Sequence, residues 1–150
     1  EVFKFLVIYI FIWNNKEFND IFDGIVYATY ASLGFALIEN ILYVYSNGAS
    51  VGIARAFTAV PAHAVFGITM GFFFGLAKFS NKKYSNNLAL AILVPILLHG
   101  FYDFILMMQN NYLLILFIPY LIVILWVSFK MMKKHSDNSK FSNKNNSVSG

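Results

Sequence analysis

The hydrophobic residues of the chain fall into five apolar segments that are separated by short polar, Asn-rich connections. Four of the segments are about 20 residues long, which is the length an α-helix needs to cross the hydrocarbon core of a bilayer. The segments are residues 1–13, 22–45, 61–79, 88–108 and 112–132. The pattern predicts an all-α fold, a polytopic transmembrane helix bundle with about five membrane segments.

The first segment is too short to cross a membrane by itself. It begins with Glu1 rather than Met, inside a stretch that already has helical character, and it lacks the charged and small-residue regions of a signal peptide. We therefore expect an N-terminally truncated fragment. A less apolar stretch, residues 50–60, precedes the third segment.

Composition agrees with lipid as the solvent of this chain. Hydrophobic residues make up 59% of the chain and charged residues 12%, whereas soluble domains have about 25% charged residues. The absence of cysteine excludes disulfides, thiolate metal sites and a cysteine nucleophile. The net charge of +4 lies mostly in the connections and the C-terminal stretch, so we interpret it as a topology signal, with no nucleic-acid partner.

The basic residues predict the orientation of the helices. Lysines fall on alternate connections and on the C-terminal stretch, which places these parts in the cytoplasm under the positive-inside rule. They are Lys16, Lys78, Lys82, Lys83, Lys130, Lys133, Lys134, Lys140 and Lys144. Arg55 is interpreted as a residue of the outer interface. We expect a membrane core over residues 1–132 and a disordered cytoplasmic tail over residues 133–150.

Several ionisable residues lie inside the apolar segments, where each is a functional candidate by default because its burial in lipid is costly. They are Glu1, Lys4, Glu39, His63, His99 and Asp103. A rise of ~1.5 Å per residue sets their heights above the cytoplasmic ends of the segments: ~20 Å for Glu1, ~24 Å for Glu39, ~22 Å for His63 and ~20 Å for His99. Four segments thus carry an acid or an imidazole at one level, in the outer half of the membrane.

Helical spacing predicts local contacts among these groups. His99 and Asp103 are four residues apart and share a helix face, and Lys4 is one turn from Glu1 and can offset its charge. A stripe of glycines at residues 67, 71 and 75 predicts close packing of the third segment against another helix.

Two kinds of chemistry suit this set of residues. A carboxylate can take a proton from water while an imidazole stabilises the oxyanion, or His63, His99 and Glu39 can hold a zinc ion with an open water position. The zincin, serine-hydrolase and phosphate-loop motifs are absent. Spacing alone indicates a water-activating or proton-handling site within a membrane.

Three motifs in order resemble the PrsW family of intramembrane proteases, which is related to the CAAX prenyl protease and bacteriocin-immunity superfamily. Phe35, Glu39 and Asn40 match its Phe-x-x-x-Glu-Asn motif, His63 matches a later histidine, and the final motif is matched by His99, Tyr102 and Asp103. Glu1 and Lys4 match the end of a Glu-Glu-x-x-Lys motif whose first residue would precede this chain.

The resemblance implies an intramembrane metalloprotease or glutamate peptidase of the plasma membrane. It implies catalytic roles for Glu1, Glu39, His63, His99 and Asp103, with Lys4, Asn40 and Tyr102 supporting them. The expected substrate is a single-pass membrane protein, similar to an anti-sigma factor, cut near the extracytoplasmic side. Zinc is the candidate cofactor, with a metal-free mechanism as the alternative.

Two other functions remain compatible with the residues alone. A proton-coupled transporter also carries buried acids and histidines, although the chain lacks an inverted repeat and paired broken helices. A non-catalytic membrane interaction or immunity protein would use the glycine stripe to bind partner helices.

Overall fold

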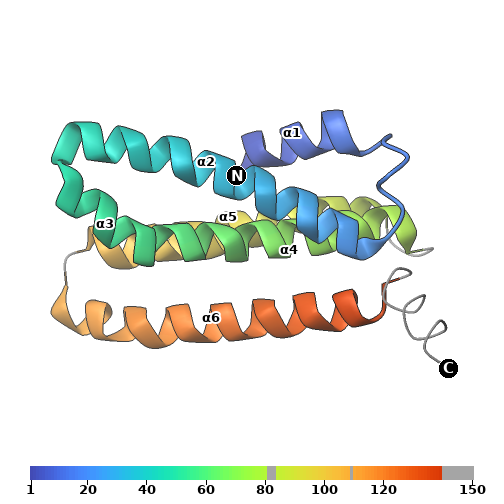
Figure 1. Cartoon of the computed structure of the whole chain (residues 1–150). Coiled ribbons are helices and arrows are strands. Elements are labelled where there is room, and N and C mark those ends of the chain that lie inside the picture. Colours follow the sequence, from blue (N-terminus) through green and yellow to red (C-terminus); the bar gives the residue numbers. More distant parts are fainter. Residues whose placement is uncertain (81–83, 109, 140–150) are drawn as a thin grey trace, which may run out of the picture.

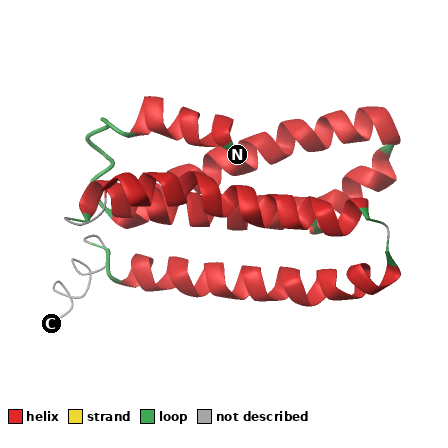
Figure 2. Cartoon of the chain, turned by 180° about the vertical axis from the view of Figure 1, so that it is seen from behind, coloured by secondary structure: helices red, strands yellow, loops and turns green. Residues whose placement is uncertain are grey.

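The computed structural model describes residues 1–80, 84–108 and 110–139, and six α-helices account for most of these residues (Figure 1). They are α1 (Val2–Ile12), α2 (Ile21–Asn47), α3 (Ala49–Phe57), α4 (Ala59–Phe79), α5 (Tyr84–Met107) and α6 (Asn111–Asp137). The reverse view shows helices and short loops over the same described part (Figure 2). The predicted all-α class is confirmed.

Within the described residues, four helices, α2, α4, α5 and α6, are long and apolar enough to cross a membrane. They run roughly alongside one another in both views, as expected of a polytopic bundle (Figures 1 and 2). Helix α1 is shorter, at 11 residues, and lies beside the same bundle. The less apolar stretch at residues 50–60 forms most of the separate helix α3 and the first turn of α4. Pro61 is accommodated there because the first turn of a helix does not need its N–H.

The glycine stripe packs α4 directly against α2, as predicted. A methyl group added at Gly71 would lie 2.2 Å from the carbonyl oxygen of Gly24, and one at Gly75 would lie 2.8 Å from the Cα of Ile21. At Gly67 the nearest atom would be the Cα of Thr29, at 2.7 Å. The two backbones therefore approach as closely as small residues allow, which is how helices associate where lipid offers no hydrophobic driving force.

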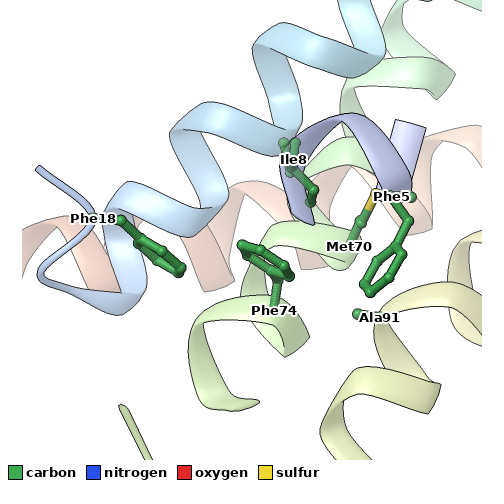
Figure 3. Close-up of a cluster of buried hydrophobic side chains, with 7 residues drawn as sticks. Phe5, Ile8, Phe18, Met70, Phe74 and Ala91 are labelled. Carbon is green, nitrogen blue, oxygen red and sulfur yellow. The ribbon is translucent and has the colours of Figure 1, made fainter. Parts of the chain in front are cut away.

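Two clusters of buried side chains hold the remaining helices to α4. The first joins Phe5 and Ile8 of α1 and Phe18 of the following loop to α4 and α5 (Figure 3). Its members are Phe5, Ile8, Phe18, Ala28, Met70, Phe74 and Ala91. The second cluster joins α4, α5 and α6 through Phe66, Tyr102 and Phe117, among others.

Polar contacts fix the connection between α1 and α2. Lys78, at the end of α4, donates hydrogen bonds to the carbonyl oxygens of Trp13 (2.6 Å) and Phe18 (3.1 Å). Asp20 and Asp23 form a capping box at the start of α2. These contacts fix the C-terminal end of α1, the helix that follows Glu1.

Helix α6 continues to Asp137, five residues beyond the end of the predicted apolar segment. The predicted tail from residue 140 onward lies outside the described residues, and so do Lys82, Lys83, Lys140 and Lys144.

The α2–α4 contact gives a direct test of the packing. Gly71→Ala should lower the thermal unfolding midpoint in detergent, because its methyl group would meet backbone atoms of α2 that cannot move aside; overpacking of this kind costs about 1–3 kcal/mol. Gly34→Ala is the matched control, since nothing lies within 4 Å of the added methyl group on the same bundle. Equal midpoints for the two variants would contradict the packing.

Candidate functional site

A pocket of about 240 Å³ lies between the start of α1 and helices α2, α4 and α5. It brings together ionisable residues from four of the predicted segments, with two phenylalanines beside them. The lining residues are Glu1, Phe3, Lys4, Phe35, Glu39, His63 and His99. The acids and imidazoles that sequence spacing placed at one depth therefore lie in one pocket.

Glu1 and Lys4 form the most buried charged pair of the pocket. Lys4 Nζ contacts Glu1 Oε1, and the two side chains are 4% and 3% exposed. Lys4 Nζ also lies 2.9 Å from His63 Nδ1. Because an unpaired charge at such a buried position would be costly, the lysine partly neutralises the carboxylate and ties α1 to α4.

His63 is held from two sides by α2. Its Nε2 atom lies 3.0 Å from Glu39 Oε2, and its backbone carbonyl accepts a hydrogen bond of 2.6 Å from the buried hydroxyl of Ser32. The glycine packing places α4 close enough to α2 for both contacts, since a methyl group at Gly67 would lie 2.9 Å from the Ser32 Cβ.

His99 faces a carboxylate at each ring nitrogen. Its Nδ1 atom lies 2.7 Å from Glu1 Oε1, and its Nε2 atom lies 3.6 Å from Asp103 Oδ2 on the next turn of α5. The ring stacks on Phe66, with 4.8 Å between the ring centroids, and its centroid is 4.9 Å from that of His63. The imidazole is thus oriented by Glu1 and by an aromatic face, with Asp103 at ion-pair distance from its other nitrogen.

The predicted supporting residues Asn40 and Tyr102 lie beside the pocket and outside its lining. Asn40 Nδ2 donates to the carbonyl oxygen of Gly52 at 3.4 Å, which connects α2 to α3. Tyr102 is buried between α4, α5 and α6 and packs on Phe117 and Phe66. Lys4, the third supporting residue, is the one that lies in the pocket.

Glu1, His63 and His99 form a group that can hold a metal ion, because their ligand atoms lie within 4.8 Å of one another. Two imidazoles and one carboxylate are a common ligand set of catalytic zinc. Glu1 Oε2 is also buried without a hydrogen-bond partner among the described residues, so an acceptor is open. These residues fit a zinc ion, provided that Lys4 withdraws from Glu1 and His63.

This group differs by one residue from the set expected from sequence, which contained Glu39 in place of Glu1. Glu39 Oε2 is engaged by His63 Nε2 and by Arg55 Nη2, at 3.0 Å and 3.2 Å. Glu39 and Lys4 therefore contact different nitrogens of the His63 ring, Glu39 at Nε2 and Lys4 at Nδ1.

Sequence reasoning missed three residues at the site, namely Phe3, which lines the pocket, Arg55 and Phe66. Arg55 was assigned to the outer interface, yet it forms an ion pair with Glu39 from helix α3. This pairing carried no signal in the sequence, because it depends on the chain reversal at Gly48 that brings α3 back to α2. Phe66, which stacks on His99, carried no signal that distinguishes it from other apolar residues of its segment.

The matches to known proteins all point to one family. A family model described as PrsW family intramembrane metalloprotease matches residues 1–130. The chain is 42% identical to Protease PrsW of Oceanobacillus iheyensis, over 93% of this chain and 64% of the relative. It is 46% identical to Protease PrsW of Geobacillus kaustophilus, over 75% and 50%, and 38% identical to that of Bacillus subtilis, over 89% and 62%.

The chain thus spans 50–64% of the length of these three curated relatives. No solved structure matches it.

Proposed function

Because the chain belongs to the PrsW family of intramembrane metalloproteases, we propose that its pocket hydrolyses a peptide bond of a membrane-anchored protein. One observation carries the proposal: acids and imidazoles from the start of α1 and from α2, α4 and α5 line one pocket of a bundle whose long helices suit a membrane. Such groups are costly in lipid and are found where they do chemistry.

Glu39 is the general base in this proposal. Its side chain lines the pocket and is 38% exposed, so a water molecule has room to approach the carboxylate. Although Oε2 is engaged by Arg55 and His63, a carboxylate has about four acceptor positions, and the others remain for water. Glu39 takes the water proton while the water oxygen attacks the carbonyl carbon of the substrate.

The developing oxyanion needs positive charge and hydrogen-bond donors on the opposite side of the pocket. In the metal-free alternative, Lys4 supplies an ammonium group that Glu1 already holds in place. Fixed donors of this kind stabilise a tetrahedral intermediate without reorganising. When the carbon–nitrogen bond breaks, the proton held by Glu39 passes to the leaving amine.

Zinc is the proposed cofactor, held by Glu1, His63 and His99. When bound, it would supply a Lewis acid and lower the pKa of a bound water. Glu39 lies outside the ligand group and keeps its role as base, and Asp103 orients His99 through Nε2.

In the proposed topology, the protein spans the plasma membrane several times and has its C-terminus in the cytoplasm. The α1–α2 connection and the C-terminal ends of α4 and α6 lie at the same end of the bundle in Figure 1, and they carry Lys16, Lys78 and Lys134. Arg55 belongs to α3, at the other end. The substrate would be a single-pass protein similar to an anti-sigma factor, cut near the outer face.

The assignment of Glu39 as the general base is tested by measuring cleavage of a membrane reporter by the full-length protein in proteoliposomes. Glu39→Gln should lower kcat by roughly 10²–10⁴-fold, because the amide cannot accept the water proton. Glu17→Gln, in the exposed loop before α2, is the matched control and should cleave at the wild-type rate. Wild-type cleavage by Glu39→Gln would reject this assignment.

Zinc binding is measured on the purified protein by titration calorimetry and by elemental analysis. We expect about one zinc per chain, lost in His63→Asn and in His99→Asn, because each removes one of three ligands. Lys4→Met should bind zinc more tightly, since its ammonium contacts two of the ligands. His135→Asn, on α6, is the matched control; zinc retained by both ligand variants would contradict the site.

The orientation of the helices across the membrane is tested with a cysteine-labelling scan, for which the cysteine-free chain is well suited. A cysteine at Asn47 should react with an impermeant maleimide added outside intact cells, whereas one at Asn15 should react only after permeabilisation. The reverse pattern would place the C-terminus outside.

A further inference from the structure

We propose that Arg55 is a positioning residue for Glu39, and that the short helix α3 exists in this fold to bring the guanidinium to that carboxylate. The inference rests on the proposed function, in which Glu39 is the general base. It concerns a residue that neither the motif pattern nor the metal-ligand group includes.

The geometry fixes one oxygen of Glu39 from two directions. Arg55 Nη2 lies 3.2 Å from Glu39 Oε2, and His63 Nε2 lies 3.0 Å from the same atom. A carboxylate with one hydrogen bond can rotate about it, whereas two donors from different helices restrict its orientation. Glu39 is thereby directed towards the pocket with its remaining acceptor positions available to water.

The guanidinium is itself supported by an aromatic platform. Its central carbon lies 3.7 Å from the centroid of the Tyr43 ring, which is one helical turn beyond Glu39 on α2. The Arg55 side chain is 17% exposed, and its Nε atom is buried without a partner among the described residues. A planar cation stacked in this way presents its Nη atoms in a fixed direction, which an ammonium group would not do.

Three features of the backbone dock α3 onto α2. Gly48 joins the two helices with a φ of 88°, a conformation that favours glycine. Gly52 faces α2 so closely that an added methyl group would lie 2.2 Å from Val44 Cγ2. Asn40, the neighbour of Glu39, donates to the carbonyl oxygen of Gly52 at 3.4 Å. The position of Arg55 therefore depends on the close packing of α3 against the C-terminal end of α2.

The arrangement places the cation where the proposed reaction takes place. Glu39 is 38% exposed and lines the pocket, so the ion pair lies within reach of water and substrate. Ile53 and Phe57 of α3 are 63% and 79% exposed, so the helix buries little apolar surface. What α3 adds to the bundle is the cation beside the proposed base.

The first test compares Arg55→Gln and Arg55→Lys in the full-length enzyme with the membrane reporter. Arg55→Gln should lower kcat by about 10- to 100-fold, the worth of a charge-assisted hydrogen bond, and leave KM within about threefold. Arg55→Lys should fall between Arg55→Gln and wild type, because it keeps the charge and loses the stacked fork.

The second test distinguishes positioning from support of the fold. In a Glu39→Asp background the shorter carboxylate no longer reaches Arg55, so adding Arg55→Gln should lower kcat less than twofold further. A residue that only stabilises the bundle would lower kcat by the same factor in both backgrounds. Equal factors would therefore overturn the inference.

The third test moves α3 without touching Arg55. Gly52→Ala should lower kcat as Arg55→Gln does, because the methyl group displaces α3 from Val44. The double variant Gly52→Ala, Val44→Ala should recover at least half of the wild-type kcat, since it removes the clashing Cγ2 atom. Val44→Ala alone is the control and should remain near wild type.

The outcomes for this inference and for the proposed function are separable. If wild type cleaves, Glu39→Gln does not, and Arg55→Gln keeps the wild-type kcat, the positioning role is overturned and the proposed function stands. If wild type fails to cleave any membrane-anchored substrate, the proposed function is overturned, and the role of Arg55 falls with it.

Discussion

The contact between the backbones of α2 and α4 determines where the site lies. Because no side chain separates Gly24 from Gly71, the two helices approach closely enough for Ser32 to reach the carbonyl of His63 and for Glu39 to reach its ring. Lipid provides no hydrophobic driving force for apolar helices to associate. Their association therefore depends on close van der Waals packing and on polar contacts. In this bundle the same contact that holds the helices together also brings Ser32 and Glu39 to His63.

The charged groups of the pocket, together with Asp103 and Arg55 beside it, form a continuous series of contacts across the bundle. It runs from Asp103 through His99 and Glu1 to Lys4, and then through His63 and Glu39 to Arg55. Acids and bases alternate along most of it, which lowers the cost of keeping each charge away from water. Such a series also couples its members, so that the effect of changing one group depends on its neighbours.

Sequence reasoning reached the helical class, the glycine packing and the ionisable residues because these features follow from period, length and the cost of charge in lipid. It did not reach α3, because nine moderately apolar residues suit an interfacial stretch as well as a helix. It assigned Glu39 rather than Glu1 to the metal group because helix depth fixes a residue's height and leaves its direction around the helix axis open. The pairing of Arg55 with Glu39 required the chain reversal at Gly48 to be known.

Most of the strongly charged side chains of the pocket have a partner that is close in sequence. Glu1 pairs with Lys4 within one turn, His99 with Asp103 on the next turn, and Glu39 with an arginine carried by the helix that directly follows. During biosynthesis these segments leave the translocon one after another, before the bundle has assembled. Each can therefore partition into lipid as a nearly neutralised unit, so the charges of the pocket need not block insertion while their distant partners are still being made.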